Sequence, residues 1–464
     1  MSSRIHQLHR ACPYVFVVLA LATSLFLALK IPPFMNADEV AHAQRANLTT
    51  FGRLIGERTG TPQARVAGGM VDIPIAEAAE PFGDMRFHPE VKATPADFEA
   101  AAQYRFDGRI MQTAFPGAAV YPPVFYLPAS AAMAVGKAFD WRVVDTLYLA
   151  RAAGAVCCVL LGFLALRIAG RARWPMFAIL ALPMSCSLYA AVSCDGLLLV
   201  TTALGVALAS RAIYEQRAMT PKAALAAALC FGLVAATKPP YAVFGLILLT
   251  APGLTLRLRA LAAAISFGLP VAWSLWMDAA VRTPIRLPGT AVDAEAQAAL
   301  LMAHPLNVWP IAVNTLTLEW DFLLRSAIGI LGWLDTPLPK AIYPAAVAAV
   351  VLAVLVALGG RTGRAWTATK AAAPVIVALA GGGVFLGMYL LWTDVGLDKV
   401  NGVQGRYLLP LAVFATLLVE GARAARAHPA TDAVKAALAG LVLAFPVASF
   451  AVVVHAVMQR FYGG

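Results

Sequence analysis

The sequence predicts an all-α fold, a polytopic transmembrane helical bundle of about eleven spans with two external loops that carry interfacial helices. Of the 464 residues, 60% are hydrophobic and only 13% are charged, a balance that excludes a soluble domain. Long apolar runs recur along the chain, and most basic residues stand at the ends of these runs. The formal net charge of +11 is therefore a mark of membrane topology and not of nucleic-acid binding.

The first expected span follows two arginines, Arg4 and Arg10, and resembles a secretory signal sequence. Its apolar run is nearly long enough to cross a membrane, and no convincing small-residue cleavage site follows it. We therefore interpret it as an uncleaved helix. The expected spans cover about residues 13–29, 146–166, 175–192, 196–212, 222–237, 241–256, 260–278, 341–359, 372–392, 407–422 and 434–456.

Short basic connections set the orientation of this bundle. With the N-terminus in the cytoplasm, every cytoplasmic connection holds two or three basic residues, so charge and span parity agree along the chain. This topology puts the C-terminus outside and makes residues 1–464 one integral membrane domain. The basic residues concerned are Arg167, Arg171, Arg173, Arg211, Arg217, Lys222, Arg257, Arg259, Arg361, Arg364, Lys370, Arg423, Arg426 and Lys435.

Two short apolar segments decide whether this parity holds. We interpret the run from Tyr121 to Phe139 as a re-entrant or interfacial helix on the outer side, because a span there would invert every later loop. A tight external hairpin at Lys238 separates the span at 222–237 from the span at 241–256.

Two large outer segments result, at about 34–145 and 279–340. The second has tryptophans suited to a membrane interface, at Trp309, Trp320 and Trp333.

The stretch from Asn36 to Arg45 begins where the chain leaves its first span, and it contains adjacent carboxylates at Asp38 and Glu39. In a helix, Asp38, His42 and Arg45 fall at positions i, i+4 and i+7, on one face. An acid, an imidazole and a guanidinium beside a membrane could bind a polar substrate and take a proton from it. The alternative is a solvated helix with Asp38 capping its first turn.

The other unusual polar motifs also fall on the outer side. Ionisable groups at membrane depth cost about 2.5–3.5 kcal/mol each, so several together indicate a shared polar cavity. Arg151, Lys238 and Arg406 would suit a phosphate or diphosphate group, because Arg offers bidentate hydrogen bonds and Lys a point charge. Asp195 either orients one of these cations or caps a helix. Taken singly, each motif is equally compatible with a cap, a snorkelling cation or a turn.

These motifs give a set of candidate residues. Asp38 and Glu39 are the catalytic candidates. The substrate-binding candidates are His42, Arg45, Tyr121, Arg151, Asp195, Lys238, Tyr241, Asp335, Gln404, Arg406 and Tyr407.

Known cofactor and catalytic motifs are missing from the sequence. It contains no Walker loop, no HExxH, no GxSxG and no glycine fingerprint of the dinucleotide-binding type. We therefore expect no cofactor. Asp38 and Glu39 together could hold a divalent cation, but nothing in the spacing of other residues indicates a metal centre.

Four longer motifs resemble an uncharacterised bacterial family of multi-spanning membrane proteins, known as a domain of unknown function. They are NADEVAHAQRA, YPPVFYLPA, LGWLDTPLP and QGRYLLPL. The wider arrangement resembles the C-type (GT-C) membrane glycosyltransferases. It consists of a first span, an outer Asp-Glu helix, an interfacial YPP helix and a span that starts near an Arg. The SCDG and TKPP elements extend that likeness along almost the whole chain.

The GT-C resemblance implies transfer of a sugar from a polyprenyl-phosphate-linked donor to a cell-envelope glycan or lipid acceptor. The reaction would take place on the periplasmic face of a bacterial inner membrane. An acidic residue of the first outer loop commonly acts on the acceptor hydroxyl in that superfamily, which maps to Asp38, with Glu39 adjoining. The chain departs from the pattern in having no sizeable C-terminal periplasmic domain. The alternatives are a lipid-linked sugar flippase or transporter, and a non-catalytic partner in envelope polysaccharide assembly.

Overall fold

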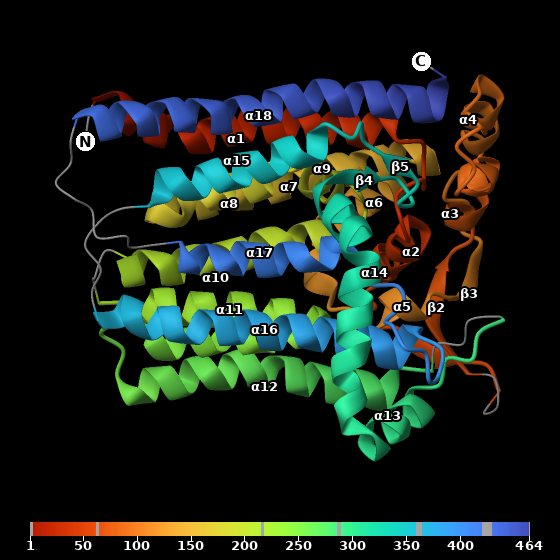
Figure 1. Cartoon of the computed structure of the whole chain (residues 1–464). Helices are drawn as coiled ribbons and strands as arrows, with labels where there is room; N and C mark the ends of the chain where they lie inside the picture. The colour runs from red at the N-terminus through yellow and green to blue at the C-terminus, as the bar shows by residue number, and fades with distance from the viewer. Residues whose placement is uncertain are drawn as a thin grey trace.

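Long helices lie side by side along one axis in the computed structural model, and the strands gather with some of the short helices at one end of them (Figure 1). The structure describes residues 3–61, 65–214, 218–284, 289–358, 364–419 and 429–463. Four of the predicted basic residues, Arg217, Arg361, Arg423 and Arg426, lie outside these ranges. The predicted all-α class is confirmed.

Six helices in the described ranges are long and apolar enough to cross a membrane. An α-helix rises about 1.5 Å per residue, so each can span a hydrocarbon core about 30 Å thick. They are α1 (Ser3–Lys30), α7 (Val143–Ile168), α10 (Asp195–Tyr214), α12 (Leu256–Ala280), α16 (Arg364–Trp392) and α18 (Pro429–Tyr462).

Shorter apolar helices occupy most of the other predicted spans. The hairpin at Lys238 is present: α11 (Pro221–Thr237) ends just before it, η4 (Pro239–Thr250) begins just after it, and the two helices pack together. A 3-10 helix rises about 2 Å per residue, so the twelve residues of η4 extend over about 24 Å. The remaining short helices are α15 (Ile342–Ala357), η6 (Gly405–Leu408), α17 (Leu409–Ala415) and η7 (Thr416–Leu418).

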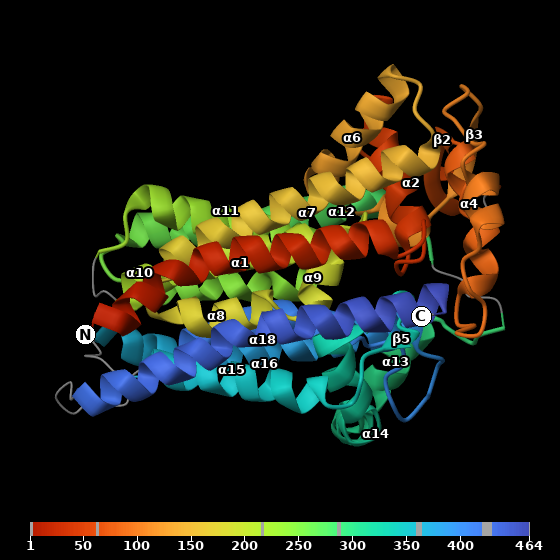
Figure 2. The ribbon, with the colours of Figure 1, turned by 90° about the horizontal axis from the view of Figure 1, so that it is seen from above.

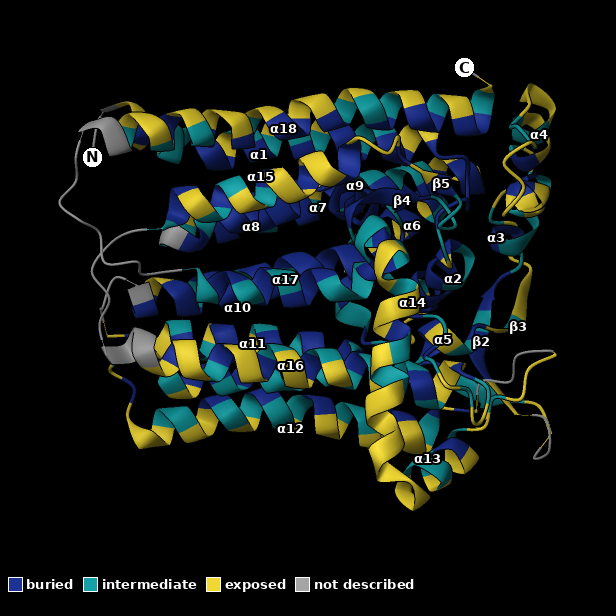
Figure 3. Ribbon diagram, viewed as in Figure 1, coloured by how far each residue is buried: buried dark blue, intermediate teal, exposed yellow. Residues whose placement is uncertain are grey.

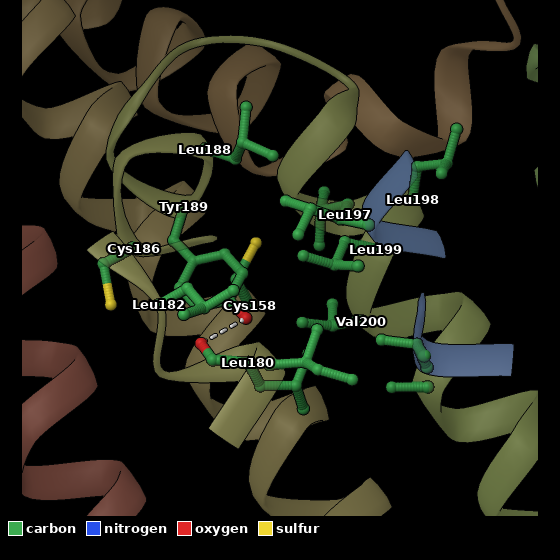
Figure 4. Packing of buried hydrophobic residues seen from close by; sticks show 14 of the residues in the cluster. Cys158, Leu180, Leu182, Cys186, Leu188, Tyr189, Leu197, Leu198, Leu199 and Val200 are labelled. Atoms are coloured by element: carbon green, nitrogen blue, oxygen red, sulfur yellow. Dashed lines mark hydrogen bonds between the residues drawn. The ribbon is translucent and has the colours of Figure 1, made fainter. Parts of the chain in front are cut away.

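The predicted span at 175–192 is not one continuous helix. It is divided into α8 (Arg173–Leu180) and α9 (Pro183–Ala190), preceded by a 3-10 turn, η3 (Gly170–Ala172). Pro183 lacks an N–H group and pushes the residue before it into an extended conformation, which ends α8. The Tyr189 hydroxyl donates a hydrogen bond of 3.1 Å to the carbonyl of Leu180 across this break (Figure 4). The freed carbonyl therefore keeps a partner inside the core.

The segment at about 34–145, the first of the two predicted to be outer, combines short helices with a small sheet. After α2 (Glu39–Thr50), three strands pair antiparallel in the order β1-β2-β3. The helix predicted over Tyr121–Phe139 begins as the turn η2 (Pro123–Tyr126) and continues as α6 (Leu127–Ala138). The other elements are β1 (Glu57–Thr59), β2 (Val66–Asp72), α3 (Pro74–Glu77), η1 (Glu80–Met85), α4 (Pro95–Ala101), β3 (Ile110–Ala114) and α5 (Pro116–Ala119).

The segment at about 279–340, the second of the two predicted to be outer, contains a helix that crosses the ends of the bundle, α14 (Val308–Gly329) (Figure 1). Trp309 and Trp320 on this helix are exposed, as an interfacial helix requires. The other elements of the segment are α13 (Ala294–Ala303), η5 (Pro305–Asn307), β4 (Ile330–Leu331) and β5 (Thr336–Pro337).

Among the six long helices α10 is the most buried, whereas α12 and α16 carry many exposed residues (Figure 3). The two ends of the bundle differ in content. The N-terminus and the ends of α7, α10 and α15 lie at one end, which is the end predicted to be basic (Figure 1). The opposite end holds α2, α6 and the C-terminus (Figure 2). All the candidate residues of the outer motifs belong to segments at this second end.

Candidate functional site

Asp38 lies at the start of α2 in an unusual backbone conformation. Its φ angle is +61°, in the left-handed region that non-glycine residues rarely adopt. It occupies the N-cap position, yet its side chain makes no capping hydrogen bond, so the capping alternative is wrong. The side chain is 54% exposed, and its Oδ2 lies 3.2 Å from Nη2 of Arg406. The carboxylate is therefore accessible and has a cation beside it.

Glu39 has the opposite environment, although it is the next residue. It is completely buried and forms a bidentate ion pair with Arg151, with distances of 2.9 Å and 2.5 Å. Asn36 and the backbone N–H of Val192 donate to the same carboxylate. Glu39 therefore joins α2 to the bundle and has no exposed oxygen for catalysis.

Arg151 is likewise a structural residue and not a phosphate ligand. An arginine has five N–H donors, and all five are used here. Two go to Glu39, and three go to the main-chain carbonyls of Ala28, Ile31 and Pro32 at the end of α1. The sequence prediction that Arg151 binds a phosphate is therefore corrected, because no donor remains for a ligand.

His42 and Arg45 are buried beside two tyrosines of the YPP segment. His42 Nδ1 and the Tyr126 hydroxyl share a hydrogen bond of 2.6 Å, and the imidazole stacks on the Tyr121 ring. Burial lowers the pKa of His42, against the opposing effect of the carboxylates of Asp195 and Asp38. Arg45 donates to the carbonyls of Tyr121 and Leu54. These two residues hold the YPP segment in place behind Asp38.

A chain of charges connects three distant segments with Asp38. Lys238 Nζ lies 2.6 Å from Oδ1 of Asp195, and Arg406 Nε lies 3.8 Å from Oδ2 of the same carboxylate. Arg406 then reaches Asp38 through Nη2. Asp195 thus orients both cations, one of the two roles that the sequence left open. Arg406 is 9% exposed, and its Nε has no hydrogen-bond partner in the described part of the chain.

Aromatic side chains line the same cluster. Lys238 Nζ lies 4.3 Å from the centre of the Tyr407 ring, a favourable cation–π distance. The Tyr241 hydroxyl donates to the backbone carbonyl of Tyr407 at 2.6 Å, which fixes η6 against η4. The structure therefore brings together Asp38, Asp195, Lys238, Arg406 and Tyr407.

Asp335 lies at a different contact, between the two outer segments and α18. Its Oδ2 accepts hydrogen bonds from the backbone N–H of Phe87 and from Arg460, at 3.1 Å and 2.9 Å. Arg460 also donates to the carbonyls of Met85 and Val91. The Oδ1 of Asp335 accepts a third hydrogen bond, from the hydroxyl of Thr336 at 3.1 Å. All three partners of Asp335 are protein groups, so this residue acts as a clamp between these elements.

Sequence reasoning missed Arg86 and did not assign Trp333 to the site. The Arg86 guanidinium lies 3.7 Å from the centre of the Trp333 ring, and the indole donates to the carbonyl of Phe34 at 3.4 Å. Burial lowers the pKa of Arg86, while the nearby carboxylate of Asp38 acts in the opposite direction. Trp333 belongs to the LGWLDTPLP motif, so the sequence contained a signal for its role in the site. Nothing in the sequence distinguishes Arg86 from the other outer arginines.

Backbone strain is concentrated around these residues. Five described non-glycine residues have φ near +50° to +62°, and four of them, Phe34, Asp38, Phe87 and Leu334, belong to the segments that meet here. Left-handed conformations of this kind cost about 1–3 kcal/mol each and persist mainly at functional sites. The concentration of strain therefore supports a functional role for this end of the bundle.

No group of three or more His, Cys, Asp or Glu residues in the described ranges could hold a metal ion. The adjacent carboxylates of Asp38 and Glu39 contact different arginines. They therefore do not form a shared pair of ligands for a divalent cation.

Fold and site together define an integral membrane protein of the helical class, with a charged cluster at one end of its bundle. The chain belongs to the family described as "Predicted membrane protein (DUF2142)", which matches residues 21–415. The resemblance of its long motifs to a family of unknown function is therefore confirmed. The chain matches no curated protein and no solved structure.

Proposed function

We propose that this protein is a GT-C type glycosyltransferase that uses a polyprenyl-phosphate-linked sugar. One observation carries the proposal. Asp38 presents an accessible carboxylate, free of any capping role, within 3.2 Å of a nearly buried arginine. A general base beside an anion-binding group is what attack by a sugar hydroxyl on a phosphate-linked sugar requires.

In this proposal Asp38 is the general base. The acceptor hydroxyl oxygen bonds to the anomeric carbon of the donor sugar, and the bond from that carbon to the phosphate oxygen breaks. The hydroxyl proton passes to the Asp38 carboxylate. The electron pair of the broken bond stays on the phosphate, which leaves as polyprenyl phosphate and is held by Lys238 and Arg406. Asp195 is the positioning residue for both cations.

Two sequence candidates become positioning residues in this scheme. Glu39 and Arg151 fix the start of α2 to α1 and α7, which holds Asp38 at the end of the bundle. His42, Arg45 and Tyr121 support the wall behind it. The acceptor would be a cell-envelope glycan or lipid.

The proposal includes a location in a bacterial inner membrane, with the N-terminus in the cytoplasm and the C-terminus in the periplasm. Its support is that the N-terminus and the ends of α7, α10 and α15 lie at one end of the bundle, and the charged cluster lies at the other (Figure 1). Reporter fusions after residues 100 and 310 should read as periplasmic, and a fusion after residue 253 as cytoplasmic. A cytoplasmic signal at 310 would contradict the proposed topology.

The decisive experiment is transfer of a labelled sugar from its polyprenyl phosphate in proteoliposomes. Asp38→Asn should lower the rate by about 10²–10⁴-fold, the usual worth of a general base. Asp145→Asn, which changes an exposed aspartate at the start of α7, is the matched control and should leave the rate unchanged. Equal rates in wild type and Asp38→Asn would exclude the mechanism.

Two alternatives make different predictions in the same proteoliposomes. A flippase would move the lipid-linked sugar across the bilayer with no new glycosidic bond. An assembly partner would show neither reaction. Transporters carry polar groups near the middle of the membrane, whereas the charged cluster here lies at one end of the bundle, which favours the enzyme.

A further inference from the structure

A second candidate site lies beside the charged cluster. A cavity of about 240 Å³ opens between α14 and the segment that leads into η6. Its wall includes Glu319 and Phe322 from α14, Leu334 from the LGWLDTPLP motif, and Asn401 and Gln404 from the opposite segment. Gln404 stands two residues before Arg406, so the cavity adjoins the site that contains Asp38.

The backbone that carries Asn401 and Gln404 is firmly held. The N–H of Val400 donates to the hydroxyl of Thr315 at 2.8 Å, and the N–H of Asn401 donates to that of Thr393 at 3.0 Å. The N–H of Gly405 donates to the hydroxyl of Ser326 at 2.8 Å. Val400 and Val403 are buried between these anchors. The two amide side chains therefore extend from a preorganised wall, which lowers the entropic cost of binding a ligand.

The polar groups of the wall are those that bind hydroxyl groups. Gln404 Oε1 is buried and has no hydrogen-bond partner in the described residues. A buried acceptor of this kind costs about 1–3 kcal/mol unless a donor reaches it. Glu319 is neutralised by Lys399 at 2.7 Å, so the cavity has little net charge to offer a phosphate. Phe322 and Leu334 supply an apolar surface next to these groups.

We propose that this cavity binds one neutral sugar ring, with Gln404 Oε1 accepting a hydrogen bond from a ring hydroxyl. A sugar ring combines hydroxyl donors at its rim with apolar C–H faces, which match the amides and the Phe322 ring. The volume lies below the roughly 300–1,000 Å³ of a drug-sized pocket, so it suits a single ring. Whether that sugar belongs to a donor or to an acceptor rests on the proposed function. The binding of a sugar in this cavity does not depend on it.

The test uses the full chain in lipid nanodiscs and a panel of methyl glycosides of hexoses and N-acetylhexosamines, with binding followed by saturation-transfer NMR. At least one glycoside should bind the wild type. Gln404→Met keeps the length of the side chain without its acceptor and should weaken that binding by about five- to tenfold. Gln459→Met changes an exposed glutamine on α18 and should have no effect. No binding to the wild type, or equal binding to Gln404→Met, would overturn the proposal.

A second variant fills the cavity. Asn401→Trp should abolish glycoside binding while the unfolding temperature stays near that of the wild type, and unchanged binding in this variant would also overturn the proposal. The glycoside assay includes no transfer step and does not require Asp38 to act as a base. Failure of sugar transfer would therefore remove the proposed function alone. Competition by polyprenyl-phosphate-sugar would identify the cavity with the donor sugar, and simultaneous binding would identify it with the acceptor.

Discussion

Two ion-pair clusters lie side by side at the start of α2 and differ in how completely their donors are used. In the cluster of Glu39 and Arg151, every N–H of the arginine has an acceptor and no oxygen of the carboxylate reaches solvent. In the cluster of Asp38 and Arg406, the carboxylate is half exposed and an arginine N–H has no partner. The number of hydrogen bonds made, and not the residue type, distinguishes the structural ion pair of Glu39 from the candidate site at Asp38.

The largest stability effect should come from the saturated cluster. Arg151→Met leaves Glu39 as a buried charge without its partner and should lower the free energy of unfolding by about 3–5 kcal/mol. Denaturant unfolding in detergent would measure it. Asp38→Asn should leave stability near wild type, because the Asp38 side chain caps nothing. Similar stabilities of the Arg151→Met variant and the wild type would remove the distinction between the clusters.

The next effect concerns ligand affinity in the unsaturated cluster. Arg406→Ala should weaken binding of polyprenyl phosphate by about 1.5–3 kcal/mol, the worth of a charge-assisted hydrogen bond. Arg406→Lys should weaken it less, because the charge remains while the planar fork is lost. Arg53→Ala, at an exposed arginine of the segment that carries Asp38, is the control. Wild-type affinity in both Arg406 variants would show that the phosphate binds elsewhere.

The smallest effect should come from Arg86, an exposed arginine that stacks on Trp333 and is close enough to Asp38 to interact with its charge. Arg86→Gln should reduce polyprenyl-phosphate affinity by roughly 0.5–1 kcal/mol, because exposed cations contribute little and are screened by salt. The difference from wild type should shrink as the salt concentration rises. Arg105→Gln, which alters an exposed arginine paired with Asp140, is the comparison. A loss as large as that of Arg406→Ala would place Arg86 among the principal ligands.

The sequence predicted the class of fold because hydrophobic runs and basic connections are local signals. The same signals predicted the hairpin at Lys238 and the short helix after Tyr121. Pro183 is a sequence signal for the break between α8 and α9, but the apolar run on both sides of it also fits one continuous span. The 3-10 winding of η4 had no sequence signal. This helix packs against α11 and α16, so its conformation reflects tertiary packing and not local propensity.

The sequence predicted which segments form the candidate site, but it did not predict which residues are structural and which are accessible to a ligand. Asp38 and Glu39 are neighbours of similar chemistry, and the pairing of Glu39 with Arg151 links residues 112 positions apart. The tertiary fold determines whether an ion pair keeps any hydrogen-bonding group free. It decides which main-chain carbonyls accept from the arginine and which N–H groups donate to the carboxylate. The left-handed backbone of Asp38 has the same origin.

The clamp made by Arg460 has a consequence for how the protein is assembled in the membrane. Arg460 belongs to α18, and its hydrogen bond to Met85 joins residues 375 positions apart. The segments that contain Met85 and Asp335 are synthesised before α18, so their hydrogen bonds to Arg460 can form only when α18 is present. Contacts of such long sequence separation form late in folding. During biogenesis the contact of α18 with the segments that carry Met85 and Asp335 can therefore form only after the last helix of the chain has been made.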